Sequence, residues 1–366
     1  MLFEMSNNSG GMMSDALLLS RYVPRRRLTV PAHEVPRARF PAVDAHTHLG
    51  RWLSDWDDRP GEWMVPDVPA LLDVMDERDI RSLVNLDGRW GAELKANLAR
   101  YDAAHPGRFV TFCHVDWAEL ALPDGATRLV KSLTESKEAG AGGLKVWKDL
   151  GLEVRDGRGD LVLPDDPRLA ALWDTAGELD LPVWIHTADP RAFFDPVDEH
   201  NELLEILLAH PEWSFARPGL PSFERLMDAL EAVVAAHPRT TFVAVHGGGN
   251  AEDLGWVGRM LDTYPNLHID IAARLNQLGR QPRATRALIM RHPDRVLFGT
   301  DEIPHTGAAY PLHFRFMETD DECFPYSPEE PPPMGRWVIS GVHLPDDVLR
   351  LVYAGNAGRL LPGLAR

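Results

Sequence analysis

Short apolar runs alternate with longer amphipathic stretches from residue 41 to the end of the chain. The apolar runs have the length and composition of buried strands, and the stretches between them, such as 69–79, 92–104 and 251–264, show a helical period. The predicted strands are 41–46, 81–87, 109–115, 142–147, 182–187, 241–246, 267–271 and 295–300. Eight such strand–helix units favour a closed α/β barrel over a doubly wound sheet.

Proline marks where the predicted helices end. His-Pro pairs at 105–106, 237–238 and 292–293, and a Tyr-Pro pair at 264–265, each precede an apolar run. Proline cannot continue a helix and pushes its predecessor out of the helical region, so each pair predicts a helix end. The connections at 51–66, 189–221 and 302–344 follow predicted strands and are longer than a barrel unit needs. We expect extended loops at the barrel mouth, where long loops are usually functional.

Polar side chains stand at or near the C-terminal ends of five predicted strands. They are His46, His48, Lys145, His186, His246 and Asp301. All strand C-termini meet at one mouth of a parallel barrel, which is where the chemistry of such barrels takes place. Alternate residues of a strand face the same way, so His46 and His48 can bind one ion together. Imidazoles with one carboxylate suit Zn²⁺ or a similar divalent ion, so the pattern predicts a metal-dependent enzyme.

Composition narrows the class of protein. The formal net charge of -17 argues against nucleic acid and anionic membranes as partners. The sequence holds no apolar run of about 18 residues, and its first residues lack the features of a secretory signal. Two cysteines, Cys113 and Cys323, fit a reducing compartment, so we expect a cytoplasmic protein. The arginine-rich residues 1–38 predict a basic arm before a single barrel domain at 39–366.

The strand-end motifs resemble those of the amidohydrolase superfamily, in the branch that includes aminocarboxymuconate-semialdehyde decarboxylase. The resemblance spans residues 40 to 362. The segments that carry it are Val43-Asp44-Ala45-His46-Thr47-His48, Val183-Trp184-Ile185-His186, Val245-His246, Leu297-Phe298-Gly299-Thr300-Asp301 and Tyr353-Ala354-Gly355-Asn356-Ala357-Gly358-Arg359-Leu360-Leu361. It implies a distorted (β/α)8 TIM barrel that binds one or two divalent metals.

The resemblance also implies roles for the strand-end residues. His46, His48, His186 and Asp301 would ligate the metal, most simply Zn²⁺, with Mn²⁺ as the alternative. His246 would transfer protons or ligate a second metal. Lys145 would be a carboxylated bridge between two metals, a lysine that binds a substrate anion, or part of a structural ion pair. Trp52 and Arg274, on the mouth side, are further candidates for substrate binding.

Two reactions fit this set of residues. In the first, a metal-activated water hydrolyses a C–N or C–O bond next to a carbonyl of a small organic substrate, with Asp301 taking the proton and His246 assisting at the carbonyl oxygen. In the second, the same site decarboxylates an aromatic or unsaturated carboxylate without oxidation. Because loops set substrate choice in barrels, the sequence leaves the two open. We expect a small-molecule substrate and a homodimer.

Overall fold

The computed structural model describes residues 25, 27–52 and 61–364. The chain divides into two units, Met1–Val30 and Pro31–Arg366, and every strand and helix of the described residues belongs to the second unit. Most of the predicted basic arm, and Trp56 in the connection at 51–66, lie outside the described residues. None of the helices in the described ranges is long and apolar enough to cross a membrane.

All eight predicted strands form, in the predicted places and in parallel. One sheet has the order β1-β2-β3 and the other the order β4-β5-β6-β7-β8. The strands are β1 (Ala42–Thr47), β2 (Ile80–Asn85), β3 (Phe109–Thr111), β4 (Leu144–Val146), β5 (Val183–Ile185), β6 (Phe242–Ala244), β7 (Leu267–Asp270) and β8 (Val296–Leu297).

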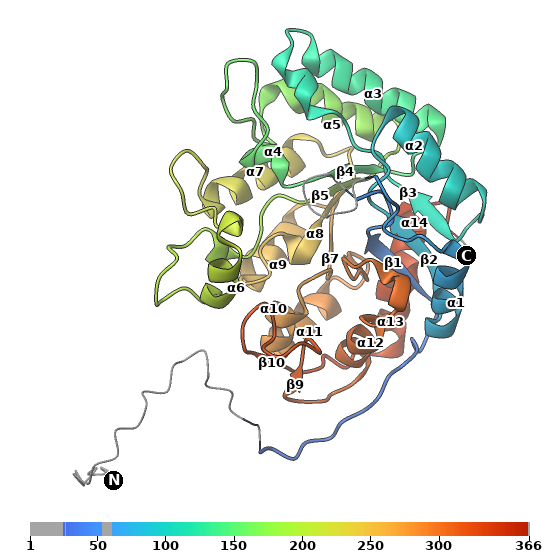
Figure 1. The fold of residues 1–366 in the computed structure, drawn as a ribbon, viewed down its shortest axis with the longest axis vertical. Coiled ribbons are helices and arrows are strands. Elements are labelled where there is room, and N and C mark those ends of the chain that lie inside the picture. The colour runs from blue at the N-terminus through green and yellow to red at the C-terminus, as the bar shows by residue number, and fades with distance from the viewer. Residues whose placement is uncertain (1–24, 26, 53–60, 365–366) are drawn as a thin grey trace, which may run out of the picture. The chain divides into compact units, whose positions relative to one another are not determined.

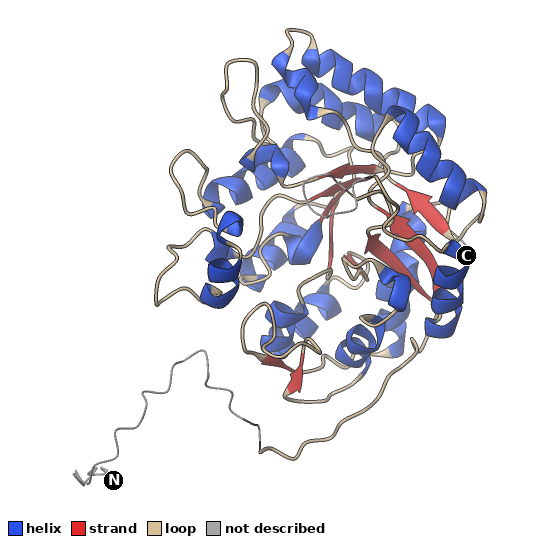
Figure 2. Ribbon diagram, in the orientation of Figure 1, coloured by secondary structure: helices blue, strands red, loops and turns tan. Residues whose placement is uncertain are grey.

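Backbone hydrogen bonds join the two sheets into a ring. The Lys145 N–H donates to the Cys113 carbonyl at 2.8 Å, which links the end of β3 to β4. On the other side the Asp301 N–H donates to the His46 carbonyl at 2.8 Å, which links the residues after β8 to β1. Strands lie inside and helices outside (Figures 1 and 2). The fold is therefore the predicted α/β TIM barrel.

The outer helices end where the X-Pro pairs predict. Among the described residues, α7 stops at Ala236, α9 at Thr263 and α11 at Arg291, each just before such a pair. The longer helices are α1 (Val68–Arg78), α2 (Gly91–Leu98, continued by a π turn over Ala99–Ala103), α3 (Gly125–Ala139), α5 (Ala170–Glu178), α7 (Phe223–Ala236), α9 (Leu254–Thr263), α11 (Pro282–Arg291) and α12 (Tyr310–Glu318). The shorter ones are α4 (Asp149–Leu152), α6 (Leu204–Ala209), α8 (Val245–Gly248), α10 (Leu275–Arg280), α13 (Asp346–Arg350) and α14 (Asn356–Leu360), the last preceded by a π turn over Leu351–Gly355.

Side-chain caps start several of these helices. Asp67 accepts a hydrogen bond from the Ala70 N–H at the start of α1, and Ser222 and Asp253 do the same for α7 and α9. Each cap satisfies a backbone donor that the first turn leaves without a partner, and such a cap is worth about 1 kcal/mol. The caps therefore set the first residue of each helix independently of the barrel.

Two apolar layers surround the strands. Alternate residues of a strand face opposite sides, so Trp184 of β5 packs with the inner layer while Val183 and Ile185 join the outer one. The Trp184 ring packs edge-on against the Phe112 ring, with 4.7 Å between the ring centroids. Its N–H donates a hydrogen bond to the Ala45 carbonyl at 3.0 Å. The inner layer also includes residues of the C-terminal segment, among them Ala357, Leu361 and Leu364. The barrel interior is thus a packed core rather than a channel.

The two longest connections carry structure of their own. The first contains α6 and lines a cavity of about 350 Å³ formed by residues 191–224, in which Arg191 pairs with Glu224. The second contains α12 and a short antiparallel pair, β9 (Phe324–Pro325) and β10 (Val338–Ile339), none of which the sequence pattern predicts. Short 3-10 helices lie at Trp117–Ala121, Pro167–Leu169, Arg191–Phe193, Pro211–Trp213 and Pro304–Thr306.

Candidate metal centre

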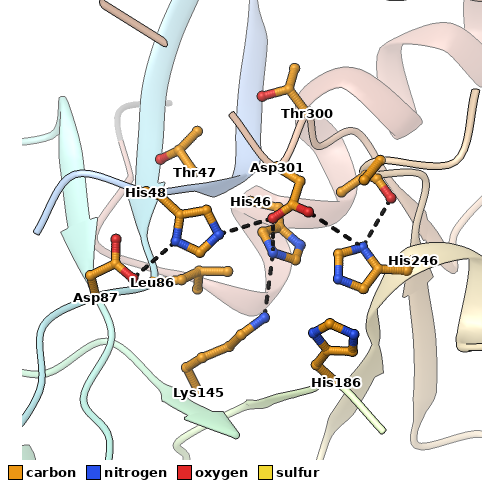
Figure 3. A network of polar contacts seen from close by, with 12 residues as sticks. His46, Thr47, His48, Leu86, Asp87, Lys145, His186, His246, Thr300 and Asp301 are labelled. Atoms are coloured by element: carbon orange, nitrogen blue, oxygen red, sulfur yellow. Dashed lines mark hydrogen bonds and ion pairs between the residues drawn. The ribbon is translucent and has the colours of Figure 1, made fainter. Parts of the chain in front are cut away.

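Side chains from three strand ends converge on the Asp301 carboxylate (Figure 3). Asp301 Oδ1 lies 3.0 Å from His46 Nε2 and 2.9 Å from His48 Nε2. Asp301 Oδ2 lies 3.9 Å from His246 Nδ1. Residues that follow β8, end β1 and follow β6 therefore form one buried cluster, as the strand-end pattern predicts.

Lys145 and His186 complete this cluster. Lys145 Nζ lies 3.4 Å from His46 Nε2, so the lysine of β4 reaches the same point as the histidines of β1. The His186 ring, just past β5, meets the His246 ring edge-on with 4.3 Å between the ring centroids. All six polar strand-end residues that the sequence singles out are therefore neighbours at one end of the barrel.

Two of these residues occupy strained backbone conformations. His246 has φ 60° and ψ 53°, and Asp301 has φ 68°, both in the left-handed region that side chains other than glycine disfavour by about 1–2 kcal/mol. The conformation turns the chain sharply at the end of a strand, and strain of this kind clusters at functional sites. The three glycines at 247–249 continue the left-handed turn after His246. In the sequence, this left-handed turn corresponds to the His-Gly-Gly-Gly segment at 246–249.

Two buried carboxylates that the sequence analysis missed hold the histidines of β1. Asp270 Oδ2 lies 2.7 Å from His46 Nδ1, and Asp87 Oδ1 lies 2.9 Å from His48 Nδ1. A carboxylate behind an imidazole fixes the ring orientation and keeps the proton on Nδ1, so that Nε2 of each ring faces Asp301 and is the nitrogen that could bind an ion. Asp270 ends β7 and Asp87 follows β2. Both obey the strand-end pattern and could have been found from it.

His186 has a carboxylate neighbour as well. Asp189 Oδ1 lies 3.4 Å from His186 Nε2, and the other oxygen of Asp189 forms an ion pair with Lys148. Burial raises the pKa of the Asp189 carboxyl, but Lys148 and His186 outweigh it and hold this pKa well below its usual value, so Asp189 is ionised.

The two sides of the cluster differ in charge. Burial lowers the pKa of His48, but the charges of Asp87 and Asp301 outweigh it and raise that pKa to about 10. Burial lowers the pKa of His186 to about 4, and burial together with neighbouring cations lowers the pKa of His246 well below its usual value. At neutral pH His48 attracts a proton or another cation, whereas His186 and His246 are neutral.

The charge states of Asp301 and Lys145 follow from burial and from each other. Burial raises the pKa of Asp301, but His46 and His246 hold it well below its usual value, so the carboxylate is ionised. Burial lowers the pKa of Lys145 to about 8, against the opposing charges of Asp301 and Asp270. Lys145 is therefore much more easily deprotonated than a surface lysine.

The donor set fits a divalent ion. One ligand atom each from His46, His48 and Asp301 lies within 4.8 Å of the others. Atoms that share a tetrahedral ion with bonds of about 2.1 Å lie roughly 3.4 Å apart. The separations of 2.9 and 3.0 Å around Asp301 Oδ1 need to open by about half an ångström to reach that value.

The predicted substrate-binding residues differ in their relation to the cluster. Arg274 is buried, with 6% of its surface exposed, and its charge contributes to lowering the pKa of His246. Trp52 lies in the turn after β1, where its backbone pairs with Glu62 and Gly61, next to the undescribed residues 53–60. The charge of Arg274 thus acts on His246, while substrate binding by Arg274 and by Trp52 stays a prediction.

Trp147, just past β4, forms an aromatic wall that the sequence analysis missed. Its ring lies 5.7 Å from the His48 ring and 6.3 Å from the His114 ring, measured between centroids. His114 itself is buried, and its Nε2 lies 2.6 Å from the Leu86 carbonyl. Trp147 follows Lys145 at the spacing of alternate strand residues, which is the signal that could have found it.

Comparison with known proteins agrees with the barrel and its motifs. A model of the amidohydrolase family matches residues 43–363. No curated protein sequence matches the chain.

Solved structures with the same fold include enzymes of two kinds. A 2,6-dihydroxybenzoate decarboxylase from Rhizobium has a TM-score of 0.54 at 18% identity, over 88% of this chain and 98% of that one. A dihydroxybenzoic acid decarboxylase from Polaromonas sp. JS666, with bound manganese and the inhibitor 2-nitroresorcinol, has a TM-score of 0.55 at 16% identity, over 88% of this chain and 96% of that one. An amidohydrolase from Burkholderia multivorans with bound zinc has a TM-score of 0.52 at 15% identity, over 87% of this chain and 98% of that one. At these identities the likeness shows the shared fold.

Proposed function

Since the chain belongs to the amidohydrolase family, we propose that it is a metal-dependent hydrolase that cleaves a C–N or C–O bond next to a carbonyl group. The observation that carries the proposal is the convergence of His46 Nε2 and His48 Nε2 on Asp301 Oδ1 at 3.0 and 2.9 Å. His46, His48, His186 and Asp301 would hold the ion. A divalent ion bound there supplies a Lewis acid and lowers the pKa of its water to about 7.

The identity of the ion is part of the proposal. Three imidazoles and a carboxylate suit Zn²⁺, and Mn²⁺ accepts the same ligands. The barrel from Burkholderia multivorans carries zinc and the one from Polaromonas carries manganese. We expect Zn²⁺ in the purified protein, with Mn²⁺ as the alternative.

Asp301 and His246 would move the proton. Asp301 is ionised, so it can accept a proton from the attacking water and pass it to the leaving nitrogen or oxygen. His246 is neutral, and its Nδ1 lies 3.0 Å from the Ala272 carbonyl, which can only accept a hydrogen bond. The proton therefore sits on Nδ1 and the lone pair on Nε2. His246 fits a residue that accepts a proton before returning it to the substrate, or one that ligates a second ion.

The position of Lys145 favours a role at the reacting centre over a structural ion pair. Its Nζ lies 3.4 Å from His46 Nε2, and a charged ammonium group there would repel a bound cation. A lysine whose pKa is about 8 is partly neutral at neutral pH. Carboxylation, which needs the neutral amine, would convert Lys145 into an anion that suits two ions. An uncarboxylated Lys145 would instead meet a substrate anion.

Decarboxylation of an aromatic carboxylate is the second candidate, and Arg274 is the observation that favours it. A buried arginine beside His246 suits a substrate carboxylate, because its guanidinium can form paired hydrogen bonds. In this reaction the C–C bond to the carboxylate breaks, CO2 leaves, and the carbon takes a proton that His246 or Asp301 has first taken up from water. The barrels from Rhizobium and Polaromonas are decarboxylases of dihydroxybenzoates.

Metal analysis and a substrate panel test both candidates. The purified protein would be offered amides, lactones and aromatic carboxylates in ¹⁸O-labelled water, with CO2 release followed in parallel. Hydrolysis predicts ¹⁸O in the acid product and no CO2. Release of CO2 without ¹⁸O incorporation would overturn the hydrolase proposal in favour of decarboxylation. Full activity after removal of divalent ions with a chelator would overturn both.

A further inference from the structure

Asp270, which ends β7, binds two functional histidines with its two carboxylate oxygens. Oδ2 lies 2.7 Å from His46 Nδ1, and neither side chain has more than 1% of its surface exposed. Oδ1 accepts a hydrogen bond from the His246 backbone N–H at 2.7 Å and one from the Ala272 N–H at 3.2 Å. Every short contact of this carboxylate is therefore made inside the candidate metal centre.

The contact with His46 determines where that ring carries its proton. An ionised carboxylate only accepts hydrogen bonds, so His46 Nδ1 must be the protonated nitrogen. His46 Nε2 is then the nitrogen left to bind an ion, and it lies 3.0 Å from Asp301 Oδ1. Only a lone pair can bind a metal ion, so the tautomer that Asp270 imposes is the one the site needs.

The contact with His246 holds a strained turn. His246 has a left-handed backbone, and its N–H points to Asp270 Oδ1 because of that conformation. The Ala272 carbonyl, two residues after Asp270, receives the hydrogen bond of the His246 ring. The segment 270–272 thus holds both the backbone and the ring of His246, and Asp270 stabilises the start of that segment through the Ala272 N–H.

We propose that Asp270 is a positioning residue that fixes the tautomer of His46 and the backbone of His246 together. The proposal rests on the proposed function, in which His46 holds the ion and His246 moves a proton. Through one carboxylate, the affinity for metal and the placement of the proton-transfer group depend on the same residue.

Asp270 does not fit the role of a metal ligand, although it forms a compact group with His46 and His246. Two atoms bound to one tetrahedral ion lie roughly 3.4 Å apart. Both oxygens of Asp270 are already engaged: Oδ2 lies at a hydrogen-bond distance of 2.7 Å from His46 Nδ1, and Oδ1 accepts from the His246 and Ala272 N–H groups. Asp270 therefore acts on the metal through His46.

Asp270→Asn tests the contact with His46. The amide keeps the size of the carboxylate, and its oxygen can still accept from the His246 and Ala272 N–H groups. Its NH2 group would face His46 Nδ1 and can only donate, so the ring would have to move its proton to Nε2. We expect the metal dissociation constant, measured by competition with a chelator, to rise about 10- to 100-fold. The ¹⁵N NMR signal of His46 Nδ1 in the metal-free protein should change from that of a protonated to that of an unprotonated nitrogen.

Asp270→Ala tests the contact with His246. It removes the acceptor of a buried N–H, so the left-handed turn loses its stabilising hydrogen bond. At saturating metal we expect kcat to fall further in Asp270→Ala than in Asp270→Asn, with KM changed less than kcat. A kcat for Asp270→Ala at saturating metal equal to that of Asp270→Asn would overturn the second half of the proposal.

Asp174→Asn is the matched control. Asp174 Oδ1 lies 2.9 Å from His237 Nδ1 on the helical side of the barrel, so it forms the same kind of pair away from the cluster. This variant should leave metal affinity and the His46 signals unchanged. The proposal is overturned if Asp270→Asn binds metal within twofold of the parent and keeps the parent tautomer, or if Asp174→Asn weakens metal binding equally. If the parent itself binds no divalent ion, the proposed function fails, and the His46 tautomer still decides the role of Asp270.

Discussion

The histidines of β1 and those that follow β5 and β6 form two halves of one cluster, and they are held in different ways. His46 and His48 each have a buried carboxylate at Nδ1, from Asp270 and Asp87. His246 instead has a backbone carbonyl at Nδ1, that of Ala272. The pKa of His48 is raised to about 10, whereas the pKa of His246 is lowered well below its usual value.

In the proposed function, this difference would separate metal binding from proton transfer. A carboxylate behind an imidazole increases the electron density on the far nitrogen, so the β1 half attracts a cation. A neutral imidazole held by a carbonyl has no such charge behind it and can take up and release a proton. Asp301 contacts both halves, with Oδ1 toward β1 and Oδ2 toward His246. It is the residue whose change should affect both tasks.

Asp301→Asn should have the largest effect. The amide keeps the shape and one oxygen that can ligate, but it cannot accept the proton of the attacking water. We expect turnover to fall about 10³-fold or more at saturating Zn²⁺, by the scale of losing a positioned base. The measurement is kcat together with metal content on the same sample. A fully metallated variant within about threefold of the parent would mean that proton transfer takes place elsewhere.

His246→Asn should have the next largest effect and separates the two halves. The change removes the neutral imidazole and leaves the β1 half intact. We expect metal content to be retained while kcat falls about 10²-fold for lost proton transfer. Metal content is measured on the protein as purified. Loss of one of two bound ions would contradict this expectation and would assign His246 and Lys145 to a second metal.

The strands were predictable because their signals are local. Each of the eight is a short apolar run bounded by an X-Pro pair or a polar strand end, and both features depend on neighbouring residues. Helix α12 was missed because Pro311 in its first turn and the prolines after it read as a loop. Its stability comes from contacts distant in sequence: Phe314 stacks on Phe298 at 6.0 Å. Packing between residues distant in sequence cannot be predicted from the residues around the helix alone.

The positions of the candidate ligands and of Asp87 and Asp270 were predictable, but which of these side chains hold the others was not. His46, His186 and Asp301 stand out because polar residues at the ends of buried strands are unusual. Asp87 and Asp270 occupy equivalent positions, yet their role depends on which way a side chain points across to the next strand. That direction is fixed only when the ring of strands closes. The chemical state of Lys145 depends on burial and on CO2, so the sequence could only set out alternatives.

The smallest expected effect is on stability, and it tests the difference between the halves without any substrate. In the metal-free protein, His186 has a pKa of about 4, below its ordinary value of 6.5. The unfolded chain therefore binds the proton more readily, and stability should fall as pH drops from 6.5 toward 4. His48 has a pKa of about 10. The folded chain binds its proton more readily, so that stability is present below pH 6.5 and is lost as pH rises toward 10.

Each substitution should reduce the pH dependence of the free energy of unfolding on one side of pH 6.5 only. His186→Asn removes the group that must become charged in acid, and His48→Asn removes the group that must lose its proton in alkali. Both side chains keep some contact with solvent, so we expect changes on the order of 1–2 kcal/mol across each side rather than the full value of the shifts. Urea unfolding at pH 5, 7 and 9 in the presence of a chelator measures them. If both variants flatten the same side, the two halves do not differ in charge, because a shared response requires that both imidazoles titrate in the same direction on folding.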